Sequence, residues 1–224
     1  MRVARQYWNP IWIVVDGSTD GTDERLRQMA ANDAGLRVYV LPQNRGKGAA
    51  ILHGLREAVA SGFTHALTMD SDGQHPADHI PEFMAIARAN PDALILGKPV
   101  FDASAPRVRV VGRRVSNGWA NLETLWAGIG DSLYGFRVYP IQPALEVAAR
   151  GDRMDFDIEI AVRLVWAGVP IINIPTGVRY LPRDAGGTSH FRPVRDNVAI
   201  TLLHTRLLFA SLRWHLGFVR RLAA

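Results

Sequence analysis

The chain has 224 residues, of which 48% are hydrophobic and 21% charged, and its formal net charge is +5. This length and composition predict one domain with a packed core, with or without an appendage, and exclude a disordered chain. The absence of cysteine excludes disulfides, thiolate catalysis and zinc–thiolate sites. The basic balance favours anionic partners such as a nucleotide, a lipid phosphate, a membrane surface or nucleic acid, although a basic soluble surface would give the same charge.

The sequence contains neither a secretory signal nor a stretch suited to crossing a membrane. Its first ten residues are polar and lack an apolar centre, and no apolar run reaches the length of about 18 residues that a spanning helix needs. We therefore expect a cytoplasmic protein, and its basic character leaves open a peripheral position on the inner face of the membrane.

The first half of the chain alternates between short apolar runs and amphipathic segments. Strands are predicted at 11–15, 37–41, 65–69 and 93–97, because these runs are continuous and apolar, as in buried parallel strands. Helices are predicted between them, over 22–32, from the turn at 44–48 through residue 59, and over 76–89. This order predicts an α/β fold with a mostly parallel sheet flanked by helices.

The second half departs from this alternation. Helices are predicted over 108–127 and 154–167, and a short strand over 133–138. Residues 169–180 are extended, but their prolines indicate an edge or irregular strand. From Pro193 onward the chain predicts one basic and apolar helix.

Two carboxylates, Asp70 and Asp72, come directly after the predicted strand 65–69. Asp16 stands in the same position after the first strand, and ligands of open α/β sheets bind at the carboxyl ends of the strands. We therefore expect these aspartates to face one crevice. Their oxygens, with the amide oxygen of Gln74, suit Mg²⁺ or Mn²⁺, and such an ion could hold a diphosphate leaving group.

Two glycine turns offer further binding groups. Asp16-Gly17-Ser18 provides a carboxylate for a base or ribose, and residues 44–48 (Asn-Arg-Gly-Lys-Gly) could cradle a phosphate at a helix N-terminus. The latter lacks the spacing of a Walker loop. The alternative for both is an ordinary strand-to-helix turn with capping or solvated side chains.

Two histidines, His75 and His79, lie four residues apart near the paired aspartates. This spacing could form a zinc pair on a helix. Pro76 lies between them and interrupts one continuous helix, which favours a solvated or supporting role for both.

Three motifs occur in order: Val-Val-Asp-Gly-Ser-Thr-Asp-Gly-Thr at 14–22, Asn-Arg-Gly-Lys-Gly at 44–48 and Asp-Ser-Asp-Gly-Gln-His at 70–75. Together they resemble family 2 glycosyltransferases of the GT-A fold, especially the dolichyl- and polyprenyl-phosphate sugar transferase branch, over residues 11–180. The resemblance implies a GT-A-like catalytic domain at 1–187 and a basic amphipathic helical segment at 188–224. It also implies a hexosyltransferase-like enzyme that uses a nucleotide-diphosphate sugar, inverts the anomeric centre and depends on Mg²⁺ or Mn²⁺.

The resemblance assigns roles to individual residues. Nucleotide-sugar binding falls to Asp16, Gly17, Ser18, Lys47, Asp70 and Asp72, the metal to Asp70, Asp72 and Gln74, the acceptor side to Arg113, Arg114, Asn117 and Arg137, and general base catalysis to Asp157 or, as second choice, Glu159. A hydroxyl acceptor needs such a base, whereas a lipid phosphate is already anionic and needs none. The alternative is that Asp157 and Glu159 are acids in the first turn of a helix, where they cap the helix.

Two departures from the family pattern bear on activity. Relatives begin with a strand resembling Val-Ile-Pro-x-Tyr-Asn-Glu ahead of the Asp16 motif, and residues 1–10 contain nothing similar. That strand lies in the middle of the sheet and forms part of the nucleotide pocket, so we expect a sheet that lacks it and weak nucleotide-sugar binding. Val15 stands where relatives often carry the first aspartate of an Asp-Asp-Gly-Ser motif.

The C-terminal segment alternates arginine with leucine and aromatic residues from residue 192 onward. This pattern suits an interfacial helix near anionic lipid, and equally a helix that packs on the core and shows a basic face to solvent.

Other readings of the whole chain stay open. One is an inactive, membrane-associated remnant of a transferase. Another is a haloacid-dehalogenase-like phosphatase, whose Asp-x-Asp-Gly motif, however, follows the first strand of its domain, whereas Asp70 follows the third. Nucleic-acid binding is disfavoured because the basic residues do not interleave with aromatics on a recognisable module.

Overall fold

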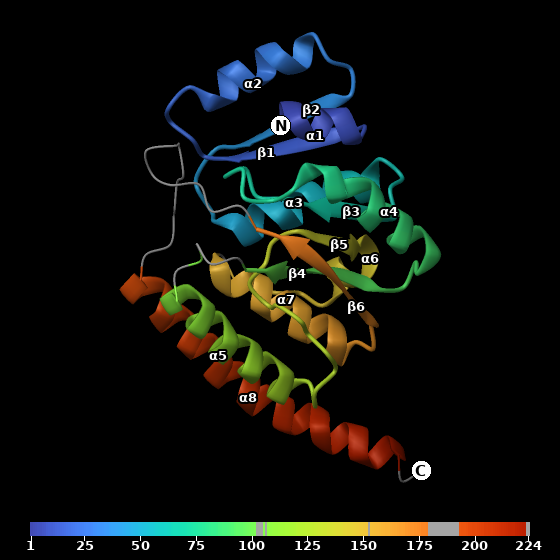
Figure 1. Cartoon of the computed structure of the whole chain (residues 1–224), viewed down its shortest axis with the longest axis vertical. Coiled ribbons are helices and arrows are strands. Elements are labelled where there is room, and N and C mark those ends of the chain that lie inside the picture. Colours follow the sequence, from blue (N-terminus) through green and yellow to red (C-terminus); the bar gives the residue numbers. More distant parts are fainter. Residues whose placement is uncertain (102–104, 106, 152, 179–192, 223–224) are drawn as a thin grey trace.

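The computed structural model describes residues 1–101, 105, 107–151, 153–178 and 193–222 (Figure 1). In chain order the elements are α1 (Arg2–Tyr7), β1 (Ile11–Asp16), α2 (Thr22–Ala31), β2 (Leu36–Leu41), α3 (Lys47–Ala60), β3 (His65–Thr68), the 3₁₀ turn η1 (Ala77–His79), α4 (Ile80–Ala89), β4 (Leu94–Val100), α5 (Arg107–Glu123), β5 (Arg137–Pro140), α6 (Ile141–Glu146), α7 (Met154–Trp166), β6 (Ile171–Gly177) and α8 (Pro193–Leu222). The expected α/β class is confirmed.

The described strands form two sheets. β1 and β2 pair in parallel over their whole length, from Ile11 opposite Leu36 to Asp16 opposite Leu41. The other sheet has the order β3-β5-β4-β6, in which β4 and β6 are parallel and β5 is antiparallel to both β3 and β4. The four-stranded sheet is therefore only partly parallel. β5 follows the long helix α5 and its loop in the chain, and a regular strand–helix–strand crossover does not precede it.

The sheet is divided between the two strands that carry the aspartate motifs. β1 and β3 belong to different sheets, and α3 packs against both of them. The short helix α1 contacts η1 and α4, and its Ala4 is buried in one cluster with Ala77, Ile80 and Phe83. The two-stranded unit is thus joined to the body by helices and side chains, and no strand pairing links it to the body within the described chain.

Each face of the four-stranded sheet covers its own apolar cluster. Leu96 and Tyr139 belong to the cluster that α7 helps to form, whereas the neighbouring residues Ile95 and Val138 belong to the cluster on the side of α4. This alternation follows from the two-residue period of a strand. α7 is buried nearly all round, as expected for a helix enclosed between a sheet and further helices.

α5 and α8 lie together on the outer side of α7 (Figure 1). α8 packs on α7 and on α5, so residues 193–222 form part of the main body. The domain boundary predicted at residue 187 falls within 179–192, outside the described residues.

Two details of the predicted elements differ from the structure. The strand expected over 133–138 is found at Arg137–Pro140, because the preceding residues form a loop that side chains of α5 hold. The short helices α1 and α6, each of six residues, were not anticipated, since so few residues give no recognisable helical period.

Candidate active site

An ion cluster forms where the paired aspartates leave β3. Lys47, the first residue of α3, places Nζ 2.9 Å from Asp70 Oδ1 and 2.7 Å from Asp157 Oδ2. Asp157 lies in the first turn of α7 and is fully buried. The cluster therefore joins β3, α3 and α7 through residues that are far apart in the sequence.

The backbone at Gly135 closes this cluster from the side of β5. A Cβ added at Gly135 would come within 2.6 Å of Lys47 Nζ and 2.8 Å of Asp70 Oδ2, closer than real Cβ contacts. Thr68 Oγ1 donates to Gly135 O at 2.9 Å, which holds the backbone in this place. A side chain at this position would therefore displace the charged groups of Lys47 and Asp70 from their present places.

The charges of the cluster support one another. Burial alone would lower the pKa of the Lys47 ammonium, but the carboxylates of Asp157 and Asp70 hold that pKa well above its ordinary value. Burial alone would raise the pKa of the Asp70 carboxyl, but the positive charge of Lys47 keeps that pKa below its usual range. At neutral pH, Lys47 is protonated and Asp70 is ionised.

His75 supports the aspartate motif from beneath. Its Nδ1 accepts a hydrogen bond from the backbone N–H of Asp70 at 3.0 Å, and its ring lies edge-on to Tyr134 with centroids 4.6 Å apart. Burial lowers the pKa of His75, which agrees with a neutral ring that accepts at Nδ1. His79 instead lies 3.5 Å from Glu82 Oε2, so the two histidines do not converge and the structure favours the supporting role for His75.

Asp16 and the glycine turn 44–48 form one structure. The backbone N–H groups of Arg45 and Gly46 donate to the Asp16 carboxylate at 2.8 and 2.7 Å, and Asn44 Nδ2 donates to Asp16 O at 3.2 Å. Gly17 has a φ of +62°, and a Cβ there would collide with the backbone of Asn44. The Asp16 carboxylate thus orders the turn that presents Lys47, while Ser18 is exposed beside it. The two predicted motifs meet through this turn.

The residues present fit a metal that arrives together with a diphosphate. Among the described residues, no group of three or more histidine, aspartate and glutamate side chains could hold a metal ion. Mg²⁺ commonly binds one or two carboxylates together with substrate phosphates, and Asp70 and Asp72 supply that number. Asp72 is half-buried and its Oδ1 accepts from the backbone N–H of Gln74 at 3.0 Å, which turns the motif back on itself.

The two acids of α7 face different surroundings. Asp157 points to Lys47, and its Oδ1 is buried without a hydrogen-bond partner. Glu159 Oε2 accepts from the backbone N–H groups of Arg150 and Gly151, and its Oε1 lies 2.8 Å from Arg163 Nε and 2.9 Å from Arg206 Nη2. Glu159 therefore ties the 150–151 loop and α8 to α7, and the geometry brings Asp157 to the cluster in preference to it.

Two of the predicted acceptor-side residues hold a loop. Arg113 Nη1 lies 2.7 Å from Asp131 Oδ1, and Asn117 Oδ1 accepts from the backbone N–H of Ser132 at 2.8 Å. This loop leads directly into Gly135. Arg114 is exposed on the same helix.

Arg137 requires a correction. It was expected on the acceptor side, but it is fully buried and its guanidinium donates to the backbone carbonyls of Tyr134 (2.6 Å), Asp157 (2.6 Å) and Ser132 (2.7 Å). It supports the floor of the cluster and cannot reach an acceptor from this position.

Sequence reasoning missed the closeness of Gly135 to the charges and the link from His75 to Asp70. The available signal for the first was a glycine between bulky residues in a strand-like run, which often marks a close backbone approach. No sequence signal pairs His75 with the backbone five residues earlier, because that bond depends on the turn after β3.

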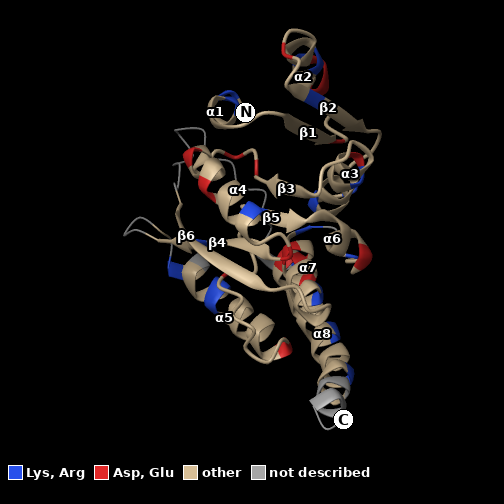
Figure 2. Ribbon diagram, turned by 90° about the vertical axis from the view of Figure 1, so that its right-hand side faces the viewer, with Lys and Arg blue, Asp and Glu red and all other residues tan. Residues whose placement is uncertain are grey.

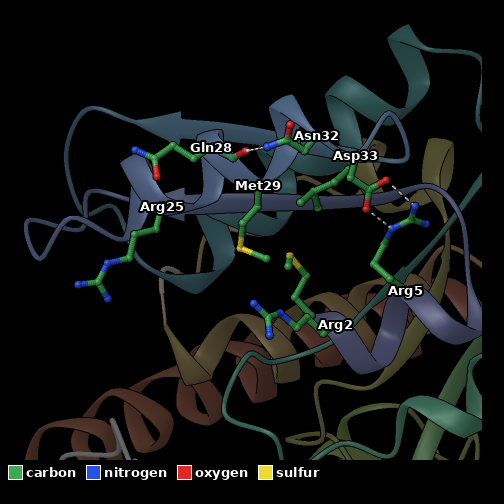
Figure 3. Close-up of a pocket in the computed structure, with 9 residues that line it drawn as sticks. Arg2, Arg5, Arg25, Gln28, Met29, Asn32 and Asp33 are labelled. Atoms are coloured by element: carbon green, nitrogen blue, oxygen red, sulfur yellow. Dashed lines mark hydrogen bonds and ion pairs between the residues drawn. The ribbon is translucent and has the colours of Figure 1, made fainter.

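A cavity with a volume of ≈ 620 Å³ lies between α1 and α2, away from this cluster (Figure 3). Arg2, Arg25 and Met29 line it, and Arg5 closes one end through an ion pair to Asp33, with Nη2 2.6 Å from Oδ1. None of the predicted site residues lines this cavity, so it lies apart from the candidate site at Asp70.

Paired carboxylates at a strand end, beside a lysine that opens a helix, place the protein in the class that its motifs resemble, the GT-A-type glycosyltransferases. The model of the family "Glycosyl transferase family 2" matches residues 3–138, and the chain belongs to that family.

Known relatives agree with the predicted branch. The chain is 28% identical over 195 residues to Glycosyltransferase AglJ of Haloferax volcanii, covering 85% of this chain and 60% of that protein. It is 26% identical over 184 residues to polyprenol monophosphomannose synthase of Mycolicibacterium smegmatis (79% and 68%), and 23% identical over 192 residues to undecaprenyl-phosphate mannosyltransferase of Micrococcus luteus (79% and 73%). The predicted resemblance is confirmed.

Solved structures confirm the fold. Glucosyl-3-phosphoglycerate synthase of Mycobacterium tuberculosis, in complex with Mn²⁺ and UDP-glucose, superposes with a TM-score of 0.59 at 18% identity, over 88% of this chain and 66% of that one. The chain thus spans about two thirds of the length of such proteins. At this identity the likeness establishes the GT-A fold alone.

Proposed function

We propose that the protein transfers a sugar from a nucleotide-diphosphate sugar to a lipid acceptor, a polyprenyl phosphate above all, with inversion and with the aid of Mg²⁺ or Mn²⁺. The observation that carries this proposal is the Lys47–Asp70–Asp157 cluster beside Asp72 at the end of β3. The names of two relatives, a polyprenol monophosphomannose synthase and an undecaprenyl-phosphate mannosyltransferase, support the acceptor class. A structural neighbour was solved with Mn²⁺ and UDP-glucose, which supports the donor class and the ion.

The donor side is assigned to the two aspartate motifs. Asp70 and Asp72, with the amide oxygen of Gln74, would hold the divalent cation, which when bound stabilises the departing diphosphate. Lys47 adds a fixed positive charge next to Asp70 and within reach of a phosphate at the N-terminus of α3. Asp16 orders the turn that carries Lys47. Gly17 lets the backbone of Asn44 approach closely, and we assign Gly17 and the exposed Ser18 to the nucleoside side.

The acceptor oxygen attacks the anomeric carbon from the face opposite the diphosphate, and the broken bond's electron pair leaves with the diphosphate. A phosphate acceptor carries its own negative charge and transfers no proton in this step. For a hydroxyl acceptor we assign Asp157 as the base, because its buried Oδ1 has no hydrogen-bond partner. With either kind of acceptor, the contact between Asp157 and Lys47 holds the Lys47 ammonium beside Asp70.

The acceptor side is assigned to α5 and the loop that it holds, with Arg113, Arg114 and Asn117 nearby. A lipid acceptor also requires access to a membrane, which we assign to the basic helix α8. Among the helices of the described chain, none combines the length and the apolar character that crossing a bilayer demands. We propose that α8 holds the protein at a peripheral position, on the inner face of the membrane.

A panel of nucleotide-sugars that includes UDP-glucose, added with Mn²⁺ and read by thermal shift, tests the donor assignment. Wild-type protein should be stabilised by one of them only when Mn²⁺ is present, and the Asp70→Asn, Asp72→Asn double variant should lose that shift. Asp78→Asn, an exposed aspartate on η1, is the matched control. A metal-independent shift, or an undiminished shift in the double variant, would contradict the proposal.

An inactive transferase remnant is the second candidate, because no strand joins β1 to β3 in the described chain. It predicts that a nucleotide diphosphate does not bind even in the presence of Mn²⁺, and that no sugar is transferred. Phosphatase activity of the haloacid-dehalogenase type is disfavoured, since the chain belongs to another family and Asp70 is held by Lys47.

A further inference from the structure

α5 and α8 expose apolar side chains in regular stripes. On α5 these are Val108, Val111, Val115, Trp119 and Leu122, and Trp126 follows at the end of the helix. On α8 they are Val198, Leu202, Phe209, Leu212 and Leu216. Steps of three or four residues, or their sum of seven, keep each set on one face of its helix.

Each stripe lies on a different side of its helix from the buried face. On α5 the buried residues are Ser116, Ala120 and Glu123, and on α8 they include Leu203 and Leu207. α5 is unusual because its buried face is small and polar while its exposed face is apolar. Val108 is 85% exposed and Trp126 69%, so this apolar face is not covered by the part of the chain that the structure describes.

A buried polar network fixes the two helices to each other. Ser116 Oγ lies 2.9 Å from His204 Nε2, and His204 Nδ1 lies 2.9 Å from Glu123 Oε1. All three side chains are buried, and Trp119 packs near the same histidine with ring centroids 6.5 Å apart. Such a network favours one arrangement of α5 against α8, so the stripes belong to one rigid platform.

The charges on this platform have one sign. For the side chains described on α5 and on residues 195–216 of α8, the exposed charged residues are all arginines, whereas the acidic Glu123 and Asp196 are buried. Figure 2 marks the basic positions in blue and the acidic positions in red on both helices. The exposed arginines are Arg107, Arg114, Arg195, Arg206 and Arg213. Of these, Arg206 already pairs with Glu159.

We propose that the outer faces of α5 and α8 together form a docking surface for an anionic lipid bilayer, which the C-terminal helix alone does not provide. Apolar stripes flanked by arginine suit burial at the level of the lipid headgroups, with the arginines near the phosphates. A second copy of this chain fits poorly, because the same face would bring arginines against arginines with no exposed acid among the described residues to pair them.

The same helix connects this surface to the catalytic cluster. The inner side of α5 holds the 131–132 loop through Arg113 and Asn117, and that loop leads to Gly135, whose backbone lies close to the charged groups of Lys47 and Asp70. A bilayer docked on α5 would therefore lie on the side of the site that we assign to the acceptor.

Co-sedimentation with vesicles tests the docking surface. Vesicles of pure phosphatidylcholine and vesicles with added phosphatidylglycerol are compared, without nucleotide-sugar or metal. Wild-type protein should bind the anionic vesicles, and binding should fall as salt rises. The triple variant Val111→Gln, Val115→Gln, Leu122→Gln should lose about tenfold or more in partitioning, while Val59→Gln with Phe63→Gln, which are exposed on another part of the surface, should not.

The arginines are tested in the same way. Arg107→Gln, Arg114→Gln, Arg213→Gln should weaken binding to anionic vesicles by about a hundredfold, at roughly 1 kcal/mol for each charge. The matched control removes the exposed Arg25, Arg27 and Arg88 from α2 and α4. Unfolding midpoints of all variants show that each is folded.

Three results would overturn the inference: no binding to anionic vesicles, unchanged binding by the α5 triple variant, or a dimer in solution that this variant dissociates. Vesicle binding without any sugar transfer would uphold the docking surface and remove the proposed function. Transfer without vesicle binding would do the reverse.

Discussion

The two ends of the molecule differ in how many of their side chains are buried. In the four-stranded body, Leu94, Ile95 and Leu96 of β4 are fully buried, and α7 is enclosed nearly all round. In the β1–β2 unit at the other end (Figure 1), Val15 and Leu36 are the buried strand residues and α2 buries none. The body holds the Asp70 cluster, and the looser unit carries Asp16. The side of the site that we assign to the metal is therefore fixed by the core, whereas the side that we assign to the nucleoside depends on one turn.

The largest expected effect comes from removing the support beneath the cluster. Arg137→Met would leave three buried carbonyl groups without their donor, and we expect a loss of roughly 3–5 kcal/mol in the free energy of unfolding. Urea unfolding measures this loss, and Arg88→Met on the exposed side of α4 is the control. A loss similar to that of the control would mean that the body does not depend on Arg137.

Next in size is the loss of the central ammonium. Lys47→Met leaves the buried carboxylate of Asp157 without its counter-charge, which we expect to cost roughly 2–4 kcal/mol of stability. Combining it with Asp157→Asn should recover part of this loss, because the two side chains are in direct contact. Urea unfolding of the single and double variants forms the cycle, and strictly additive losses would contradict the contact.

A smaller, local loss of stability is expected at the glycine turn 44–48. Asp16→Ala removes the acceptor of two backbone N–H groups, and we expect a cost of about 1–2 kcal/mol. Amide hydrogen exchange should quicken at residues 44–47 while β4 stays protected. Uniform quickening through β4 would show that the two ends are not independent.

The smallest effect concerns pH. Because burial lowers the pKa of His75, the unfolded chain binds more protons than the folded one below a pH of about 6.5, and stability should fall as the pH drops through that range. His75→Gln, which keeps an acceptor but does not titrate, should flatten the slope of unfolding free energy between about pH 7 and 5. An equal slope in both proteins would assign the decline to other groups.

The sequence predicted most elements because their signals are local. β1, α2, α3 and α7 begin within one residue of their expected positions, where apolar runs, acidic first turns or glycine turns mark them. The antiparallel pairing of β5 could not be predicted, since strand pairing depends on contacts between distant parts of the chain. The division of the sheet agrees with the missing middle strand that the family resemblance led us to expect.

The site was predictable in kind but not in each position. Asp70 and Lys47 stand in motifs, and their meeting follows from the carboxyl edge of the strands. Arg137 misled the prediction because arginine is rarely fully buried. The outward orientation of the apolar stripe on α5 could not be predicted either, since a stripe of that period normally faces a core.

The transfer of radiolabelled sugar to a polyprenyl phosphate tests the central claim most directly. A nucleotide-sugar that stabilises the protein is the donor, and Mn²⁺ is present or chelated. The account predicts transfer that requires Mn²⁺ and falls by at least about a hundredfold in Asp72→Asn, with Asp78→Asn unaffected. No transfer by the wild-type chain in the presence of Mn²⁺ would contradict it.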